Sequence, residues 1–265
     1  MTGVGVVMAS SEIVTGDVPG GPSTSQTIMV SSLQRLLAVV PSDSPPASYR
    51  AAVMDENVLG KQTASGREWA FRQLRRFYAL NPHSLLFRAL RDLWDHDKAS
   101  QPLLALLCAL ARDPVLRASA SVIIATEPGQ TVTSADFEAA IEAKFPSAYK
   151  EITRRTTAQK VASSWDQSGH LHQERPGSKI RTRVCPSSAN TTYALMLGYL
   201  EGSRGQALFK TLWTRVLDQP VSHLIDLAGS ASQEGLLEFR SAGGIMEVTF
   251  HQLLRLFDDG QGTLL

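Results

Sequence analysis

A change of hydrophobic period in the second half of the chain restricts its fold more than any other feature. Thr156–Ser168 has apolar residues at helical spacing, and Gly169 ends that pattern. Two short segments follow, Leu171–Glu174 and Lys179–Cys185, and Pro176-Gly177 lies between them as a typical turn. A helix followed by two strands and their turn is the order of a winged helix. We therefore expect a winged-helix-like unit in this part of the chain.

The same part of the chain is strongly basic. Residues 144–183 hold nine Lys or Arg and three acids, a net charge of +6. Because the whole chain carries +1, the other residues sum to −5. Clustered Lys and Arg favour phosphate backbones, since binding releases condensed counterions. Charge alone is equally compatible with an exposed basic surface. Its coincidence with a winged-helix order predicts nucleic-acid binding.

Candidate DNA contacts fall on the third helix, just before it at Arg154 and Arg155, and on the hairpin of this unit. We expect a short helix at Tyr149–Thr153 and a separate helix from Thr156 or Thr157, with polar side chains opposite a buried apolar stripe. Period two places alternate hairpin residues on one face of a strand. The predicted base contacts are Gln159, Lys160 and Ser163, and the predicted phosphate contacts are Arg154, Arg155, Lys179, Arg181 and Arg183.

Residues 47–125 have the pattern of successive helices. Thr63 is expected to cap one helix, and Gly60 to end the helix before it, which includes Asn57 and Val58. Three later helices are expected to begin with a polar residue and a proline, which lacks the N–H that the first turn does not need. These starts are Asn81-Pro82, Ser100-Gln101-Pro102 and Asp113-Pro114. Further along the chain, Thr133 or Ser134 is expected to cap another helix.

A second basic set surrounds the helix that begins after Thr63. It consists of Lys61, Arg67, Arg72, Arg75 and Arg76. With the preceding helix and the turn between them, this segment could form a helix-turn-helix. An ordinary exposed helix face is the alternative. If it is a second DNA-binding element, Lys61 and Arg67 are its candidate contacts.

These patterns predict a mainly α protein with a helical N-terminal domain, a basic winged-helix-like unit, and C-terminal helices with a small β-hairpin. We expect a mobile, disordered tail at residues 1–27, because it is rich in Gly, Ser, Thr and Pro without periodicity. The other expected boundaries are 28–128, 129–189 and 190–265. Helices are expected at Thr192–Glu201 and Gln206–Leu217, and the hairpin at 236–250.

The sequence shows little sign of a membrane-spanning segment or of a secretion signal. Its longest apolar run, Pro102–Ala111, is about half of the ~20 residues that a membrane span needs. No Lys or Arg precedes Arg35, so a basic signal-peptide region is missing. The two cysteines, Cys108 and Cys185, provide no disulfide framework. We expect a cytoplasmic protein that has no membrane partner.

Catalytic and metal-binding patterns are equally sparse. The sequence contains no GxGxxG, P-loop, GxSxG or HExxH motif. His170, His172 and Cys185 could supply three metal ligands, but a fourth ligand with convincing spacing is missing. Arg91 and His96 have the R-x4-H spacing of HEPN-type ribonucleases, a spacing that chance also produces. We expect no enzyme activity, no catalytic residue, no metal and no cofactor.

Three stretches resemble the BrxA family of bacterial BREX phage-exclusion systems. They are Asp55–Thr63 (DENVLGKQT) with the Arg-rich helix after it, Pro102–Ala118 (PLLALLCALARDPVLRA), and Tyr193–Leu217 with Glu201-Gly202 at its centre. The resemblance covers roughly residues 28–250 and rests mostly on apolar patterns. It implies a small, mainly helical, non-enzymatic DNA-binding protein. It also implies work beside the other BREX components: a methyltransferase, a phosphatase-like protein and ATPases.

The function expected from residues and resemblance together is double-stranded DNA binding with low sequence specificity in phage defence. Two alternatives remain open at this point. One is a protein-interaction adaptor whose basic face binds an acidic partner subunit. The other is an RNA-binding protein, which includes the HEPN-type ribonuclease.

Overall fold

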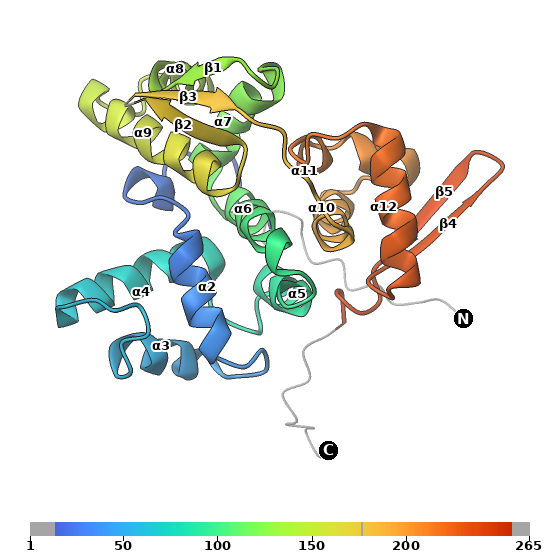
Figure 1. Ribbon diagram of the computed structural model, residues 1–265, viewed down its shortest axis with the longest axis horizontal. Helices are drawn as coiled ribbons and strands as arrows, with labels where there is room; N and C mark the ends of the chain where they lie inside the picture. Colours follow the sequence, from blue (N-terminus) through green and yellow to red (C-terminus); the bar gives the residue numbers. More distant parts are fainter. Residues whose placement is uncertain (1–13, 176, 256–265) are drawn as a thin grey trace.

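The computed structural model describes residues 14–175 and 177–255, and in them the chain is mainly helical (Figure 1). The α-helices are α2 (Val30–Val39), α3 (Pro46–Met54), α4 (Ala64–Tyr78), α5 (Leu85–Trp94), α6 (Gln101–Arg112), α7 (Pro114–Ala125), α8 (Ser134–Lys144), α9 (Glu151–Gln167), α10 (Ser188–Leu200), α11 (Leu212–Arg215) and α12 (Val221–Gln233). Short 3-10 helices are η1 (Pro22–Thr24), η2 (Lys98–Ser100) and η3 (Gly205–Lys210). The strands are β1 (Thr131–Thr133), β2 (Leu171–Arg175), β3 (Ser178–Arg181), β4 (Glu238–Ala242) and β5 (Ile245–Thr249). The predicted mainly α class is confirmed.

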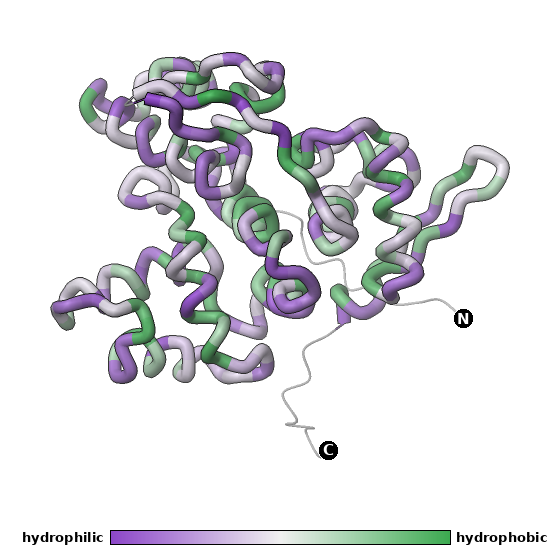
Figure 2. Tube along the Cα trace, viewed as in Figure 1, coloured by the Kyte–Doolittle hydropathy of each residue, from purple (hydrophilic) through white to green (hydrophobic). Residues whose placement is uncertain are grey.

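Helix α6 is the centre of the hydrophobic core. It contacts α4, α5, α7 and α10, and Figure 2 shows its apolar trace surrounded by other elements. Every residue from Leu104 to Ala111 is fully buried. A helix that is apolar on all sides needs neighbours on all sides. Burial on all sides therefore accounts for the apolar run at Pro102–Ala111. No helix in the described part of the chain is long and apolar enough to span a membrane.

Side-chain caps fix several helix starts where the sequence predicts them. The Thr63 hydroxyl accepts a hydrogen bond from the Gly66 N–H (3.0 Å), and Thr133 forms a capping box with Asp136. The Asp113 carboxylate accepts from Val115 N–H (2.9 Å) and Leu116 N–H (3.1 Å) at the start of α7. Each cap satisfies backbone donors that have no partner inside the helix.

Two predicted helix boundaries are wrong. The Asn81 side chain accepts from the His83 N–H (3.0 Å), which closes a local turn, and α5 begins later, at Leu85. Helix α3 ends at Met54 and not at Gly60. Asn57 has a left-handed φ of 52°, and its amide exchanges two hydrogen bonds with the Lys61 backbone. Asn57 therefore belongs to the turn between α3 and α4.

The winged-helix unit, defined here as α7 to β3, has the predicted order. Strands β1, β3 and β2 form an antiparallel sheet in that spatial order, and α8 packs between α7 and α9. Gly177 has a φ of 82° in the wing turn, and Pro176 lies outside the described residues. The two predicted helices around Thr156 are instead one, α9. The Thr156 hydroxyl donates back to the Thr153 carbonyl (3.0 Å) and caps nothing.

Residues 14–27 differ from the mobile tail expected for residues 1–27, and residues 1–13 lie outside the described residues. The Ser23 N–H donates to the buried Asp113 carboxylate (2.6 Å), and the Gly20 N–H donates to the Tyr149 hydroxyl (2.6 Å). A Cβ atom on Gly21 would lie 2.4 Å from Asp113 Oδ1, so only glycine fits there. Burial raises the pKa of Asp113. This segment is part of the packed structure.

The C-terminal part contains α10, α12 and the hairpin β4–β5, which extends away from the body of the molecule (Figure 1). The predicted hairpin is confirmed, and its turn has two left-handed glycines, Gly243 (φ 58°) and Gly244 (φ 82°). The helix predicted at 206–217 is divided into η3 and α11, because Thr211 is extended and caps α11 with its hydroxyl. The expected domain boundaries stay predictions.

Candidate nucleic-acid interface

The polar face of α9 is partly covered by the N-terminal segment. The Lys160 ammonium donates to the Thr24 carbonyl (2.9 Å), and the Gln167 amide oxygen accepts from the Val30 N–H (3.0 Å). The Ser163 hydroxyl donates within the helix, to the Gln159 carbonyl (3.0 Å). Of the three predicted base contacts, only Gln159 is exposed, and Lys160 and Ser163 are half-buried. The α9 surface is therefore less open than a groove-reading helix requires.

The predicted phosphate contacts at the start of α9 have different surroundings. The Arg154 guanidinium lies 2.7 Å from Glu142 and 3.4 Å from Glu138, both on α8. Arg155 is exposed, and its side chain has no hydrogen-bond or ion-pair partner within the described residues. Both arginines lie inside the first turns of α9, and not before it as predicted. Arg155 alone of the two is available to a ligand.

The wing cations are not the exposed row that the alternation predicts. Lys179 lies 3.0 Å from Asp166 of α9, and its side chain is 12% exposed. Arg181 is 2% exposed: its Nη2 lies 2.9 Å from Asp218 Oδ2, and its Nε donates to the Ile123 carbonyl (3.2 Å). Arg183 lies beyond the end of β3, is 58% exposed, and is 4.0 Å from the same Asp218. The prediction of a shared exposed face is wrong, because Lys179 and Arg181 face the packed side of the sheet.

Hydrogen bonds connect the wing to the segment after α11. His170 Nε2 lies 2.7 Å from the Val216 carbonyl, so this nitrogen carries the proton, and the Ser168 hydroxyl lies 2.8 Å from Nδ1. Burial lowers the pKa of His170 to about 3, although the Val216 contact opposes the change. The Gln219 amide also donates to the Val184 carbonyl (2.7 Å). His170 is a neutral packing residue, and both of its ring nitrogens already have hydrogen-bond partners, so neither is open to a metal.

Ion pairing therefore neutralises most of the basic segment. Six of its nine cations lie within 4.0 Å of a carboxylate, and four of the pairing acids lie outside residues 144–183. The six are Lys144, Arg154, Arg175, Lys179, Arg181 and Arg183, and the four outside acids are Asp17, Glu138, Glu142 and Asp218. The local charge of +6 is thus compensated by the folded chain around it.

The second basic set is arranged differently. Helix α4 buries Ala70, Leu74 and Phe77 on one side. Arg72, Arg75 and Arg76 recur at spacings of three and four residues and are exposed on the other side. Within the described chain, neither Arg72 nor Arg75 has an ion-pair or hydrogen-bond partner for its side chain. Four arginines against one glutamate give α4 a net charge of +3.

The two contacts predicted on this element, Lys61 and Arg67, lie beside that arginine row. Both are half-buried, and Lys61 is in the turn that Asn57 holds. The Arg67 Nε is buried without a partner. On this element the row is a stronger signal than Lys61 or Arg67, because its three arginines recur at helical spacing opposite an apolar stripe. The Arg112 guanidinium adds one more cation at the end of α4, where its Nε donates to the Arg76 carbonyl (3.3 Å).

Helices α3 and α4 pack against each other and are joined by residues 55–63, the order of a helix-turn-helix. The connection is longer than the 3–4 residues usual in that motif. Arg50 of α3 pairs with Glu68 of α4 at 3.3 Å, and both are exposed. Glu68 lies one turn before Arg72 on the same face of α4, but its carboxylate pairs with Arg50 and not with the arginine row.

Arg91 and His96, the predicted ribonuclease pair, have separate partners. The buried Arg91 guanidinium donates to the Leu37 carbonyl (3.2 Å) and the Val40 carbonyl (2.9 Å) at the end of α2. His96 Nε2 lies 2.8 Å from Glu234 of α12. No group of three or more potential metal ligands occurs in residues 14–175 and 177–255. The geometry does not combine these residues into one site.

Comparison with known proteins gives no matching family model and no matching curated relative.

Proposed function

We propose that this protein binds double-stranded DNA without catalysing a reaction, and that α4 makes the main contact. The observation that carries the proposal is the row of Arg72, Arg75 and Arg76, which is exposed on the second helix of a helix-turn-helix arrangement. Arg72 and Arg75 have no acidic partner among the residues described. An arginine that is not already paired can exchange water for phosphate without losing a protein contact.

The expected binding is electrostatic and has little sequence preference. Each phosphate that an arginine neutralises contributes about −0.9 to the slope of log K against log salt, so three contacts contribute about −2.7. Base reading needs polar side chains that reach the groove edges. On α9 these are restricted, because Lys160 is bound to Thr24 and Ser163 to its own helix. Lys150 and Arg155, exposed near the start of α9, are secondary phosphate contacts in this proposal.

The resemblance to the BrxA family extends the proposal to a biological setting. In it, the protein is a cytoplasmic component of a BREX phage-defence system and works with the methyltransferase, the phosphatase-like protein and the ATPases. The support for this setting is the sequence resemblance alone. The DNA-binding proposal does not depend on the resemblance, because it rests on the exposure of the α4 arginines and on their lack of acidic partners among the described residues.

The test is duplex binding across a salt series, measured by fluorescence anisotropy with a labelled 25-base-pair DNA. The variant R72A/R75A/R76A removes the row, and K98A/K210A/R240A removes three exposed cations elsewhere as a matched control. We expect the row variant to bind at least tenfold more weakly and to reduce the salt slope by about 2–3, as three lost phosphate contacts would. Equal binding by the two variants would contradict the proposal.

A further inference from the structure

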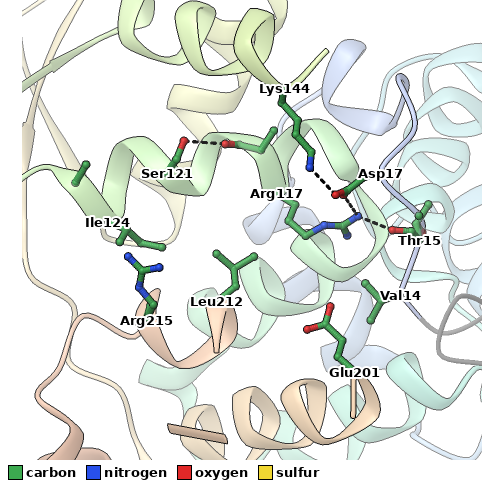
Figure 3. A pocket seen from close by; sticks show the side chains of 13 residues that line it. Val14, Thr15, Asp17, Arg117, Ser121, Ile124, Lys144, Glu201, Leu212 and Arg215 are labelled. Carbon is green, nitrogen blue, oxygen red and sulfur yellow. Dashed lines mark hydrogen bonds and ion pairs between the residues drawn. The ribbon is translucent and has the colours of Figure 1, made fainter. Parts of the chain in front are cut away.

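A cavity of about 910 Å³ lies beside α7 (Figure 3). Its walls come from α7, the end of α8, α11 and residues 14–17. Three cations, Arg117, Lys144 and Arg215, line it together with apolar side chains such as Ile124 and Leu212. Cations beside apolar side chains complement a ligand that is both acidic and apolar.

Residues 14–17 form one wall of this cavity and contact the neighbouring helices. Val14 is buried to 8% exposure. The Thr15 N–H donates to the Ala111 carbonyl (2.9 Å), and the Thr15 carbonyl accepts from Arg117 (2.5 Å). The Asp17 carboxylate lies 2.6 Å from Lys144 and 2.9 Å from Arg117. The Thr15 N–H and carbonyl are therefore both hydrogen-bonded, the Val14 side chain is buried, and the Asp17 side chain is ion-paired.

The electrostatics of the cavity favour a more acidic occupant. The hydrogen bonds from Lys144 and Arg117 lower the pKa of Asp17, so its carboxylate is the preferred form. Glu201 is the other acid of the lining, and it accepts from the Trp213 indole N–H (2.7 Å). Arg215 stands across the cavity from Asp17 and has no acidic partner in the described chain (Figure 3). One positive charge of the site is therefore uncompensated.

Gly16 leaves space that a longer side chain would use. It lines the cavity, and a Cβ atom built on it meets nothing within 4 Å. Its φ lies outside the left-handed region, so another residue can adopt this backbone without strain. A side chain at this position of the cavity wall would therefore have open space around it.

We propose that this cavity is a docking site for an acidic segment of a partner protein, which displaces residues 14–17. The segment has an apolar residue in the place of Val14, and Asp or Glu in the places of Gly16 and Asp17. Residues 14–17 act as an internal competitor. The bound backbone of Thr15 and the apolar walls favour a peptide over a nucleic acid, because a phosphate chain would use neither.

The test uses a fluorescein-labelled synthetic peptide with the sequence of residues 13–20 and the full chain as receptor. The variant D17K releases the internal competitor, since a lysine would face Arg117 and Lys144. A tethered ligand acts at an effective concentration of about mM, so we expect D17K to bind the peptide at least tenfold more tightly than the unaltered chain does. D17A is a second receptor with the same expected direction, in case the lysine disturbs folding.

Two matched variants locate the binding. The substitution K144E in the D17A receptor should abolish binding, and Lys144 is exposed enough to be changed without loss of the fold. A peptide carrying the equivalent of G16E should bind severalfold more tightly than the parent peptide, and the receptor substitution R215E should remove that gain. R72A/R75A/R76A should leave peptide binding unchanged, which separates this site from the DNA-binding proposal.

Three results would overturn the inference: no peptide binding by D17K and D17A, equal binding after K144E, or displacement of the peptide by inorganic phosphate or duplex DNA at comparable concentrations. The last would assign the cavity to phosphate groups instead of an acidic protein segment.

Discussion

The winged-helix unit and the α3–α4 pair both concentrate positive charge, but they differ in what surrounds that charge. In the winged-helix unit, Lys179 and Arg181 are turned inward to Asp166 and Asp218. On α4, Arg72 and Arg75 are exposed and lack such partners within residues 14–175 and 177–255. A high local charge in the sequence therefore indicates a binding surface only where the fold leaves the charges unpaired. Residues 144–183 are the more conspicuous basic segment of the sequence, but most of their cations are paired within the fold. The less conspicuous set around α4 supplies the arginines that are open to a ligand.

The largest expected difference is in stability. Arg181→Ala removes a buried cation and leaves the Asp218 carboxylate without it, a change that typically costs about 3–5 kcal/mol. Arg72→Ala removes an exposed side chain and should change the free energy of unfolding by no more than about 0.5 kcal/mol. Urea unfolding measured by circular dichroism compares them. A loss below about 1 kcal/mol for Arg181→Ala would show that the wing does not depend on this ion pair.

A second test concerns the pH dependence of the wing. His170 has a folded-state pKa of about 3 and an ordinary value of 6.5, so between these values the unfolded chain binds a proton that the folded chain does not. Stability should therefore be complete above about pH 6.5 and fall by up to about 1.4 kcal/mol per pH unit below it.

His170→Gln should flatten that dependence between pH 7 and pH 5, as measured by urea unfolding at each pH. His172→Gln is the control, because His172 is exposed on β2. If both variants keep the dependence of the unaltered chain, His170 is not the group that couples the wing to pH.

A third and smaller effect should follow from Thr63→Ala. This substitution removes the hydroxyl that accepts from the Gly66 N–H, and loss of an N-cap costs about 1 kcal/mol. Thermal unfolding measures this loss. DNA binding should fall less than in the arginine variants, because the cap positions α4 but contacts no phosphate. A larger loss of binding than in R72A/R75A would move the contact from the arginines to the turn.

The smallest expected effect belongs to Lys160. Its ammonium is bound to the Thr24 carbonyl, so Lys160→Met should change duplex affinity by less than about twofold, below the loss of a full phosphate contact. Anisotropy titration at one salt concentration is sufficient to measure it. A fivefold loss would mean that residues 22–24 leave α9 when DNA binds, and would restore α9 as a reading helix.

The sequence predicts the winged-helix order because the change from helical to alternating period is local, and it predicts the caps at Thr63, Asp113 and Thr133 because they involve neighbours. It does not predict which face of β3 is packed. Alternation shows that Lys179 and Arg181 share a face, but the acid that buries Arg181 is Asp218, on a distant segment. The sequence also does not predict that residues 14–27 are packed, because their partners Asp113 and Tyr149 are distant in the chain.

The most direct test of this account compares two double variants that each remove two positive charges. R72A/R75A acts on α4, and K179A/R183A acts on the wing, with the buried Arg181 left intact. We predict that duplex binding falls about tenfold for the α4 variant, with the salt slope reduced by about 1.8, and that it stays within about twofold for the wing variant. A greater loss for the wing variant would contradict the central claim that unpaired charge, and not total charge, defines the DNA-binding surface.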